Sequence, residues 1–296
     1  MTFKNTTEAY LEQKAGIPYL SFPVLAQFPF LKHGFSTRLG GVSSGVLASM
    51  NFGSDSGPDQ DTAENVQENY TRIAKAIGVE VRSMVISKQV HKTNIRRVTE
   101  ADCGKGLFRP RDYDEIDGLI TDRPNITLVT KYADCVPLYF VDPVKKAIGL
   151  THSGWRGTVA GIGRLTVEEM KNAYDSRPED IIAVIGPSIC RQCFEIGEEV
   201  AVEFEKAFPQ QQGEILFPLE SSAKQTTIAE TELPPRKKYL CDLWSANQAV
   251  LLSAGLSASN IHISGVCTSC HPELLFSHRR TQGKRGTLAA FLSLCE

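Results

Sequence analysis

The chain of 296 residues, of which 42% are hydrophobic, is long enough to bury a large core. Its 32 basic and 34 acidic residues give a formal net charge of −2 and are spread evenly along the sequence. This balance lacks the basic surface of a protein that binds nucleic acid or a membrane, and it favours a small-molecule ligand.

The first residues are polar and lack the apolar core of a signal peptide, and no later apolar run reaches the roughly 18 residues of a membrane helix. We therefore expect a cytoplasmic protein. Without a secretory signal, the eight cysteines are expected to be free thiols or metal ligands rather than disulfides.

Apolar residues at helical spacing predict a helix over Glu64–Ile77, with Asp61 or Thr62 as its N-cap and Gly78 at its end. A second helix is predicted over Thr158–Tyr174. A third, over Leu243–Ala254, is capped by Asp242 and ended by Gly255. Strands are predicted for the apolar, β-branched runs Met84–Val90, Ile126–Thr130, Val136–Val141, Ala147–Thr151, Ile181–Ile185 and Ile261–Val266.

The order of these elements mixes β–α units with strands that follow one another directly. It predicts an α+β architecture of mixed β-sheets packed together and flanked by helices. We expect residues 1–296 to form a single domain. The polar, aperiodic stretch Pro209–Lys238 is predicted to be a surface insertion.

Three side chains that suit a transition metal lie at or beside strand-like runs, namely His91, Cys135 and His152. They are 44 and 17 residues apart, so only the fold can bring them together. Each alone is also typical of a buried cysteine or a hydrogen-bonded core histidine. Together, one thiolate and two imidazoles suit zinc, or copper as the alternative, and leave a coordination position for water or substrate.

Three arginines lie in segments that suit an anion. Arg156 follows the His152 strand in a glycine-bearing turn that runs into a helix, where backbone N–H groups favour negative charge. Arg38 lies in a glycine- and serine-rich turn, and Arg280 ends the segment F-S-H-R-R. Ordinary tight turns and a solvated basic face explain the same patterns.

Two C-x-x-C pairs, Cys190 with Cys193 and Cys267 with Cys270, are of the type that binds structural zinc. However, 73 residues separate the pairs, far more than in a compact zinc ribbon. We therefore do not predict a second metal site from the sequence.

Several motifs, taken in order, resemble the YfiH family, also described as laccase-domain, multicopper polyphenol oxidase and purine nucleoside phosphorylase proteins. The resemblance covers nearly the whole chain and implies a single domain of packed mixed sheets between helices. It departs at Cys190, where relatives often carry glycine, and at His278, where tyrosine is usual. The motifs are H-G-F-S-T-R-L-G-G-V-S from residue 33, Q-V-H from 89, D-G-L-I-T from 117, A-D-C-V-P from 133, H-S-G-W-R-G from 152, I-G-P-S-I-C from 185, C-F-E-I-G-E-E from 193, C-T from 267 and F-S-H-R-R from 276.

The resemblance implies a zinc-dependent enzyme that cleaves adenosine, inosine and methylthioadenosine with phosphate and that also deaminates adenosine. It places the metal ligands, and with them the catalytic centre, at His91, Cys135 and His152. The expected partners are a nucleoside and phosphate, for which Arg38, Arg156 and Arg280 are the candidate binding residues. A homodimer is left open.

Deamination needs a metal that activates water and a group that moves protons. Asp134 neighbours Cys135 on a predicted strand, so its side chain is expected on the opposite face, and the general acid/base stays unassigned. Cys135 and His152 would also suit a cysteine hydrolase. A copper phenol oxidase is disfavoured because the chain has six histidines and no H-x-H pair. A nucleoside-binding protein without catalytic activity is the remaining alternative.

Overall fold

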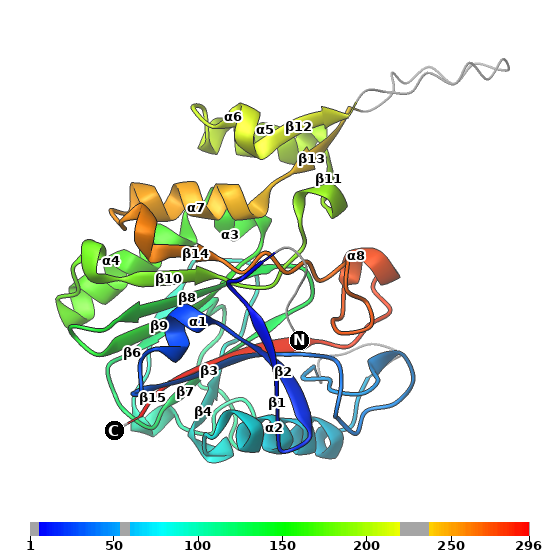
Figure 1. Cartoon of the computed structure of the whole chain (residues 1–296), viewed down its shortest axis with the longest axis vertical. Helices are drawn as coiled ribbons and strands as arrows, with labels where there is room; N and C mark the ends of the chain where they lie inside the picture. Colours follow the sequence, from blue (N-terminus) through cyan, green and yellow to red (C-terminus); the bar gives the residue numbers. More distant parts are fainter. Residues whose placement is uncertain (1–5, 54–59, 220–236, 296) are drawn as a thin grey trace, which may run out of the picture.

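The computed structural model describes residues 6–53, 60–219 and 237–295. Two six-stranded sheets pack face to face, and helices cover the outer face of each (Figure 1). This arrangement confirms the predicted α+β fold of mixed sheets flanked by helices. In the described part of the chain, no helix combines the length and the apolar character that crossing a membrane requires.

The first sheet has the order β1-β2-β3-β15-β7-β4, so a strand near the end of the chain lies at its centre. Helix α2 (Ala63–Ile77) packs on its outer face through side chains such as Tyr70 and Ile73. Thr62 is the N-cap, because its side chain accepts a hydrogen bond from the Asn65 N–H at 3.1 Å. The strands are β1 Tyr10–Lys14, β2 Ile17–Ser21, β3 Leu31–Ser36, β15 Leu288–Leu294, β7 Thr127–Tyr132 and β4 Met84–Ile86, with the short helix α1 (Pro23–Ala26) between β2 and β3.

The second sheet has the order β14-β10-β8-β9-β6-β5 and is covered by α4 (Ile162–Tyr174) and α7 (Leu243–Ser253). Asp242 caps α7 as predicted, by accepting from the N–H groups of Trp244 and Ser245. Its strands are β14 Ile261–Ile263, β10 Ile182–Ile185, β8 Val136–Asp142, β9 Ala147–Ser153, β6 Gly118–Thr121 and β5 Ile95–Arg97.

The single helix predicted over Thr158–Tyr174 is wrong. The chain forms α3 (Trp155–Val159) and then α4, and Gly161 between them has a φ of +72°. A left-handed residue breaks the α-helical hydrogen-bond ladder, and glycine adopts this conformation without a steric penalty.

The predicted strands are all present, although two of them end early. The runs that begin at Met84 and at Ile261 leave their sheets after Ile86 and Ile263. Beyond β4 the chain is polar up to Val90, which is exposed, whereas beyond β14 the run ends in a buried residue. This residue, Val266, belongs to the core between the two sheets.

The central core fills the space between the two large sheets, with Leu128 and Leu292 from the first sheet and Leu150 and Val184 from the second. The Tyr139 hydroxyl crosses this core and donates to the Gly34 carbonyl at 3.0 Å. Because strands of both sheets end at the same edge of this core, loops from the two sheets meet there.

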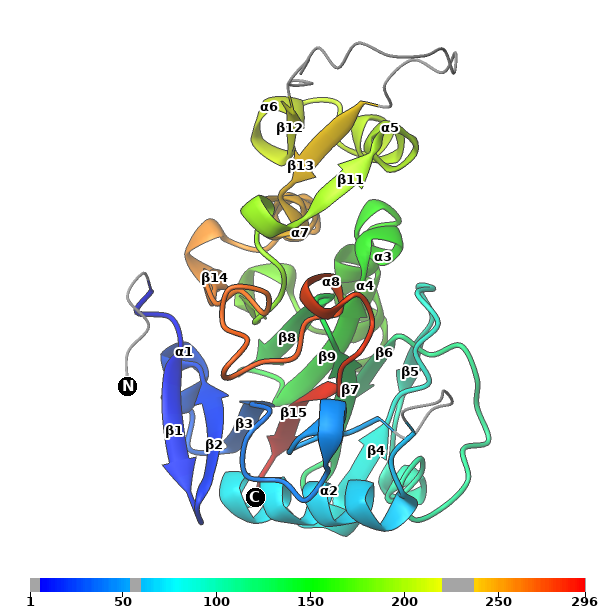
Figure 2. The same ribbon diagram turned by 90° about the vertical axis from the view of Figure 1, so that its right-hand side faces the viewer.

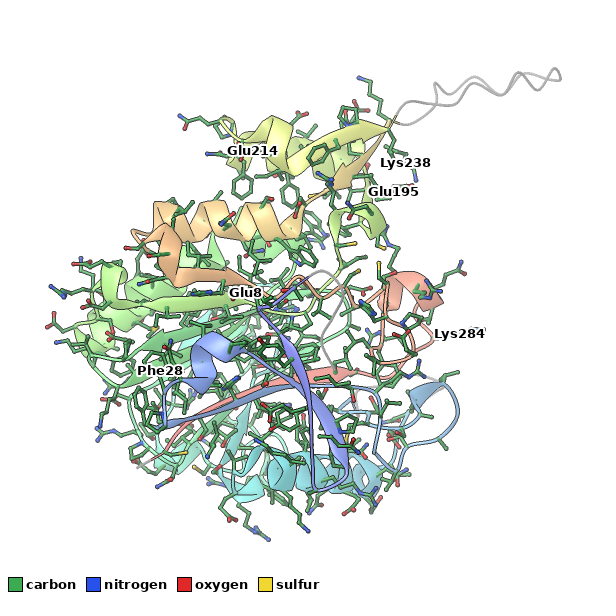
Figure 3. All side chains as sticks on the ribbon, in the orientation of Figure 1. Glu8, Phe28, Glu195, Glu214, Lys238 and Lys284 are labelled. Atoms are coloured by element: carbon green, nitrogen blue, oxygen red, sulfur yellow. The ribbon has the colours of Figure 1, made fainter. Side chains whose placement is uncertain are left out.

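A small third sheet lies beyond α7, at the end of the molecule (Figure 2). Its order is β11-β13-β12, and the side chains of Glu195 and Lys238 pair across it (Figure 3). Of the predicted insertion Pro209–Lys238, residues 220–236 lie outside the described residues. The elements here are β11 Glu195–Gly197, α5 Glu198–Ala207, α6 Gln212–Ile215, β12 Leu216–Leu219 and β13 Lys238–Cys241; α8 (His278–Thr281) follows later in the chain.

Candidate metal centre

Strand pairing explains why three distant side chains meet at one edge of the core. Strands β4 and β7 are parallel neighbours, so the segments after them, which carry His91 and Cys135, leave the sheet at the same end. The second sheet contributes His152, near the end of β9. The start of β8 pairs with the end of β9, with Pro137 opposite His152, so Cys135 lies beside that histidine.

The structure brings the three predicted ligands together. His91, Cys135 and His152 each offer one ligand atom, and these three atoms lie within 4.8 Å of one another. The Cys135 Sγ is 3.8 Å from the His91 Nε2, and the two imidazole rings have centroids 4.9 Å apart. His152 is buried and His91 is exposed, so the group has one side in the core and one side toward solvent.

Asp117 organises this group from a fully buried position before β6. Its carboxylate is 2.8 Å from the His152 Nδ1 and accepts the N–H groups of Val90, His91 and Lys92 at 3.0, 3.0 and 3.1 Å. The bond to Nδ1 leaves the Nε2 of His152 for a metal, an arrangement common around zinc. One carboxylate therefore orients one ligand and fixes the loop that carries another.

Sequence reasoning used Asp117 as part of a motif and did not recognise this role. The available signal was a charged residue directly before the short run Gly118–Thr121, which is apolar except for its last residue. Buried carboxylates are rare unless they are paired. The burial of Asp117 follows from the position of β6 between β9 and β5, which no local sequence pattern specifies.

The charges of the three ligands and of Asp117 are coupled. Burial alone would raise the pKa of the Cys135 thiol, but the imidazoles of His152 and His91 lower it to about 6. Burial would lower the pKa of His152, but Cys135 and Asp117 raise it to about 9. Burial would also raise the pKa of Asp117, and the hydrogen bond to His152 and the backbone N–H of Val90 bring it below its usual value. The site therefore favours a thiolate, which is the form that binds metals.

Two further residues fix the space around the ligands. A Cβ atom at Gly154 would lie 2.6 Å from the His91 ring and 3.4 Å from the Cys135 Sγ, so only glycine lets these ligands approach β9. The Gln89 side chain donates to the Lys131 carbonyl and accepts the Lys131 N–H, at 2.7 and 2.6 Å, and so joins the His91 loop to β7. The donor set and its spacing fit a zinc ion.

The expectation for Asp134 is wrong in one respect, because Asp134 and Cys135 lie in the turn between β7 and β8 and not on a strand. Asp134 has a φ of +90°. Its carboxylate accepts from the Thr268 hydroxyl at 2.6 Å and from the Arg279 N–H at 2.7 Å. Asp134 therefore holds two other loops in place, and this role leaves the general acid/base unassigned.

The ligand group lies in a pocket of about 660 Å³. Gly53, Ile189 and Thr287 contribute to the wall, and an aromatic ring, Phe194, lies on one side. The basic residues that line the pocket are Lys88, Arg111, Lys131, Arg279 and Arg285, with His278 beside them.

The three arginines singled out from the sequence lie elsewhere: the pocket lining, among the described residues, does not include them. The Arg38 guanidinium donates to the carbonyls of Ala48 and Pro272. Arg156 is exposed and stacks on the Trp155 ring, with the guanidinium carbon 4.2 Å from its centroid. Arg280 is exposed and donates to the Ser269 carbonyl.

Two of the arginines that do line the pocket are held in defined positions. Arg279 donates to the Glu195 carbonyl at 2.7 Å and lies over the Phe194 ring. Arg285 donates to the Thr287 hydroxyl at 3.0 Å, and its Nε is buried without a hydrogen-bond partner. Burial lowers the pKa of Arg285, although the negative charges of Asp134 and Cys135 oppose this effect. No periodic pattern or motif in the sequence marks Arg285.

The chain is similar in sequence to proteins with named activities. The chain is 36% identical over 267 residues to purine nucleoside phosphorylase YlmD of Bacillus subtilis (strain 168), covering 89% of this chain and 88% of that protein. It is 34% identical over 227 residues to adenosine deaminase RL5 from an unknown prokaryotic organism, covering 74% and 78% of the two chains.

The fold is similar to that of a solved crystal structure. The crystal structure of the Bacillus licheniformis hypothetical protein YfiH superposes with a TM-score of 0.84 at 33% identity, over 98% of this chain and 100% of that one. Residues 32–295 match the family described as multi-copper polyphenol oxidoreductase laccase. The chain therefore belongs to this family, the YfiH or laccase-domain proteins.

Proposed function

We propose that this protein is a zinc-dependent purine nucleoside phosphorylase, acting on adenosine, inosine and methylthioadenosine, with an additional adenosine deaminase activity. The observation that carries the proposal is the convergence of His91, Cys135 and His152 inside a pocket with a basic wall. The relatives named purine nucleoside phosphorylase and adenosine deaminase support the two reactions.

The metal would be held by His91, Cys135 and His152. When bound, it would supply Lewis acidity at the centre of the pocket. The donor set supports zinc over the copper of the family description. Multicopper chemistry needs further histidine clusters, and in the described part of the chain the other potential metal-binding group consists of cysteines alone.

Phosphorolysis breaks the bond between C1′ of the ribose and the purine and forms a bond from C1′ to a phosphate oxygen. The pocket offers what a dianion needs, because the guanidinium groups of Arg111, Arg279 and Arg285 can bind phosphate oxygens in pairs. Arg285 suits this role because its Nε is buried without a partner. This assignment replaces the earlier expectation for Arg38, Arg156 and Arg280.

The nucleoside would occupy the part of the pocket bounded by Phe194 and His278. An aromatic face stacks on a purine without selecting among purines, which fits a protein that accepts several nucleosides. For deamination, water must add at C6 of adenine while ammonia leaves. His152, whose Nδ1 is already bound to Asp117, is positioned and is not a free proton carrier.

The test is product analysis. Zinc-loaded protein is incubated with adenosine, with and without phosphate, and adenine, ribose 1-phosphate and inosine are quantified. Hypoxanthine is quantified as well, because inosine formed by deamination is itself a substrate for phosphorolysis. We expect adenine and ribose 1-phosphate only when phosphate is present, with ribose 1-phosphate equal to the sum of adenine and hypoxanthine, and inosine in both conditions. Turnover that survives chelation but is lost after thiol alkylation would indicate a cysteine hydrolase instead, and complete absence of turnover would indicate a nucleoside-binding protein.

A further inference from the structure

Four cysteines form a second cluster beside the pocket. One sulfur atom each from Cys190, Cys193, Cys267 and Cys270 lies within 4.8 Å of all the others. The expectation that the 73 residues between the two C-x-x-C pairs keep them apart is therefore wrong. The pairs are distant in sequence, but the sheet brings them together.

The convergence follows from parallel pairing at the edge of the second sheet. Strands β10 and β14 are parallel neighbours, so the segments that follow them leave the sheet in the same direction. The two segments continue to pair, because Ser188 accepts the Thr268 N–H and donates its own N–H to the Val266 carbonyl, both at 3.1 Å. Each segment then carries its C-x-x-C pair.

The sulfur positions match a tetrahedral thiolate site. The Cys193 and Cys270 sulfurs are 3.6 Å apart, and those of Cys190 and Cys270 are 4.0 Å apart. A tetrahedron with metal–sulfur bonds of about 2.3 Å has sulfur–sulfur edges of about 3.8 Å. The Cys267 sulfur also accepts the Cys190 N–H at 3.2 Å, the kind of hydrogen bond that stabilises a coordinating thiolate.

We propose that Cys190, Cys193, Cys267 and Cys270 bind a second zinc ion, with a structural role. Four thiolates complete the tetrahedral coordination of zinc, so the site has no open position for a substrate. Sulfurs within 4.8 Å of one another suit a single ion better than an iron–sulfur cubane, in which each thiolate binds a different iron.

The position of this ion would stabilise the pocket wall. Ile189 and Phe194, on either side of the first pair, both line the pocket. Thr268, next to Cys267, donates to the Asp134 carboxylate in the turn that carries Cys135. A zinc ion that joins the loops after β10 and β14 would therefore fix the wall and this turn without touching the substrate.

The experiment is metal quantification on the full chain, purified in reductant with zinc in the medium and then desalted. We expect two zinc ions per chain in the wild type and one in the Cys193→Ser/Cys270→Ser double variant, in which neither serine replaces a fully buried residue. A His91→Ala variant should also retain one, and X-ray absorption should then show sulfur ligands alone at about 2.3 Å. The matched control, Cys295→Ser, should retain two.

Two results would overturn the proposal. One is a single zinc ion in the wild type that His91→Ala removes and the double cysteine variant leaves in place. The other is a Cys193–Cys270 disulfide in protein purified without reductant, found by peptide mapping, with a metal content equal to that of the double variant. Neither measurement depends on enzymatic activity, so the outcome is separate from that of the proposed phosphorylase reaction.

Discussion

The two cysteine-containing clusters lie in and beside the same pocket, and they differ in composition and surroundings. The first combines one cysteine with two histidines and faces a pocket, and its His152 is positioned by the buried Asp117. The second has four cysteines that come from two adjoining loops. Open sites with three protein ligands support catalysis, and closed thiolate sites support structure. This comparison is the reason why we propose a catalytic metal at the first cluster and a structural zinc at the second.

The largest expected effect is the loss of a ligand from the open site. His152→Ala should lower phosphorolysis by about 1,000-fold, because removing a Lewis acid costs several kcal/mol in the transition state. Initial rates with adenosine and phosphate measure the change. The control, His262→Ala, removes a histidine that pairs with Glu8 instead and should keep the wild-type rate. A His152→Ala variant with normal turnover would remove the basis for the comparison.

A smaller loss is expected when the support of the ligand is changed and the ligand is kept. Asp117→Asn preserves shape but weakens the bond to the His152 Nδ1, and such second-layer changes cost about 10- to 100-fold in metal affinity or activity. The zinc affinity, measured by titration, and kcat should both decrease. Asp112→Asn is the control, since Asp112 is exposed and pairs with Lys105. If Asp117→Asn lowers stability alone, Asp117 has only a structural role.

The sequence predicted the strands β4, β7, β8, β9, β10 and β14, two capped helices and the three candidate ligands of the open site, because each of these depends on local pattern or on a motif. It did not predict the other strands, among them β15 near the centre of the first sheet. Thr62, Asp242 and the apolar runs before Cys135 and His152 carry their signals within a few residues. The fold class followed from the order of these elements.

What the sequence did not predict depends on contacts between distant segments. Asp117 is recognisable only when β6 is placed beside β9, and the cysteine pairs converge only when β10 and β14 are known to be neighbours. The arginines of the pocket also could not be identified from local sequence. Arg38 lies in a motif but its guanidinium binds backbone carbonyls, whereas Arg285 lies in an unremarkable polar segment and lines the pocket.

His33 sharpens the contrast between ligand and core histidines. Burial lowers its pKa to about 4, and its Nε2 accepts the Phe22 N–H at 2.9 Å, so it is neutral and unavailable to a metal. Because the folded pKa lies below the unfolded value of 6.5, the unfolded chain binds the extra proton, and stability is lost as the pH falls from about 6.5 toward 4. The expected loss between pH 7 and 4.5 is about 2 kcal/mol.

Urea unfolding at the two pH values measures this loss in the wild type and in His33→Gln, whose amide oxygen can still accept the Phe22 N–H. The variant should lose about 2 kcal/mol less than the wild type over the same interval. Equal losses in both proteins would show that other groups dominate the acid sensitivity.

The smallest effect concerns the wall of the pocket at the open site, which the cysteine cluster adjoins. Arg285→Lys keeps a positive charge but loses the planar fork that binds phosphate oxygens in pairs, so KM for phosphate should rise about tenfold, which corresponds to about 1.4 kcal/mol. Arg156→Ala should leave KM unchanged, because Arg156 is exposed and stacks on Trp155 outside the pocket lining. The reverse result would return anion binding to the turn after β9. It would also mean that the pocket wall, and the cysteine cluster that adjoins it, lies away from the phosphate.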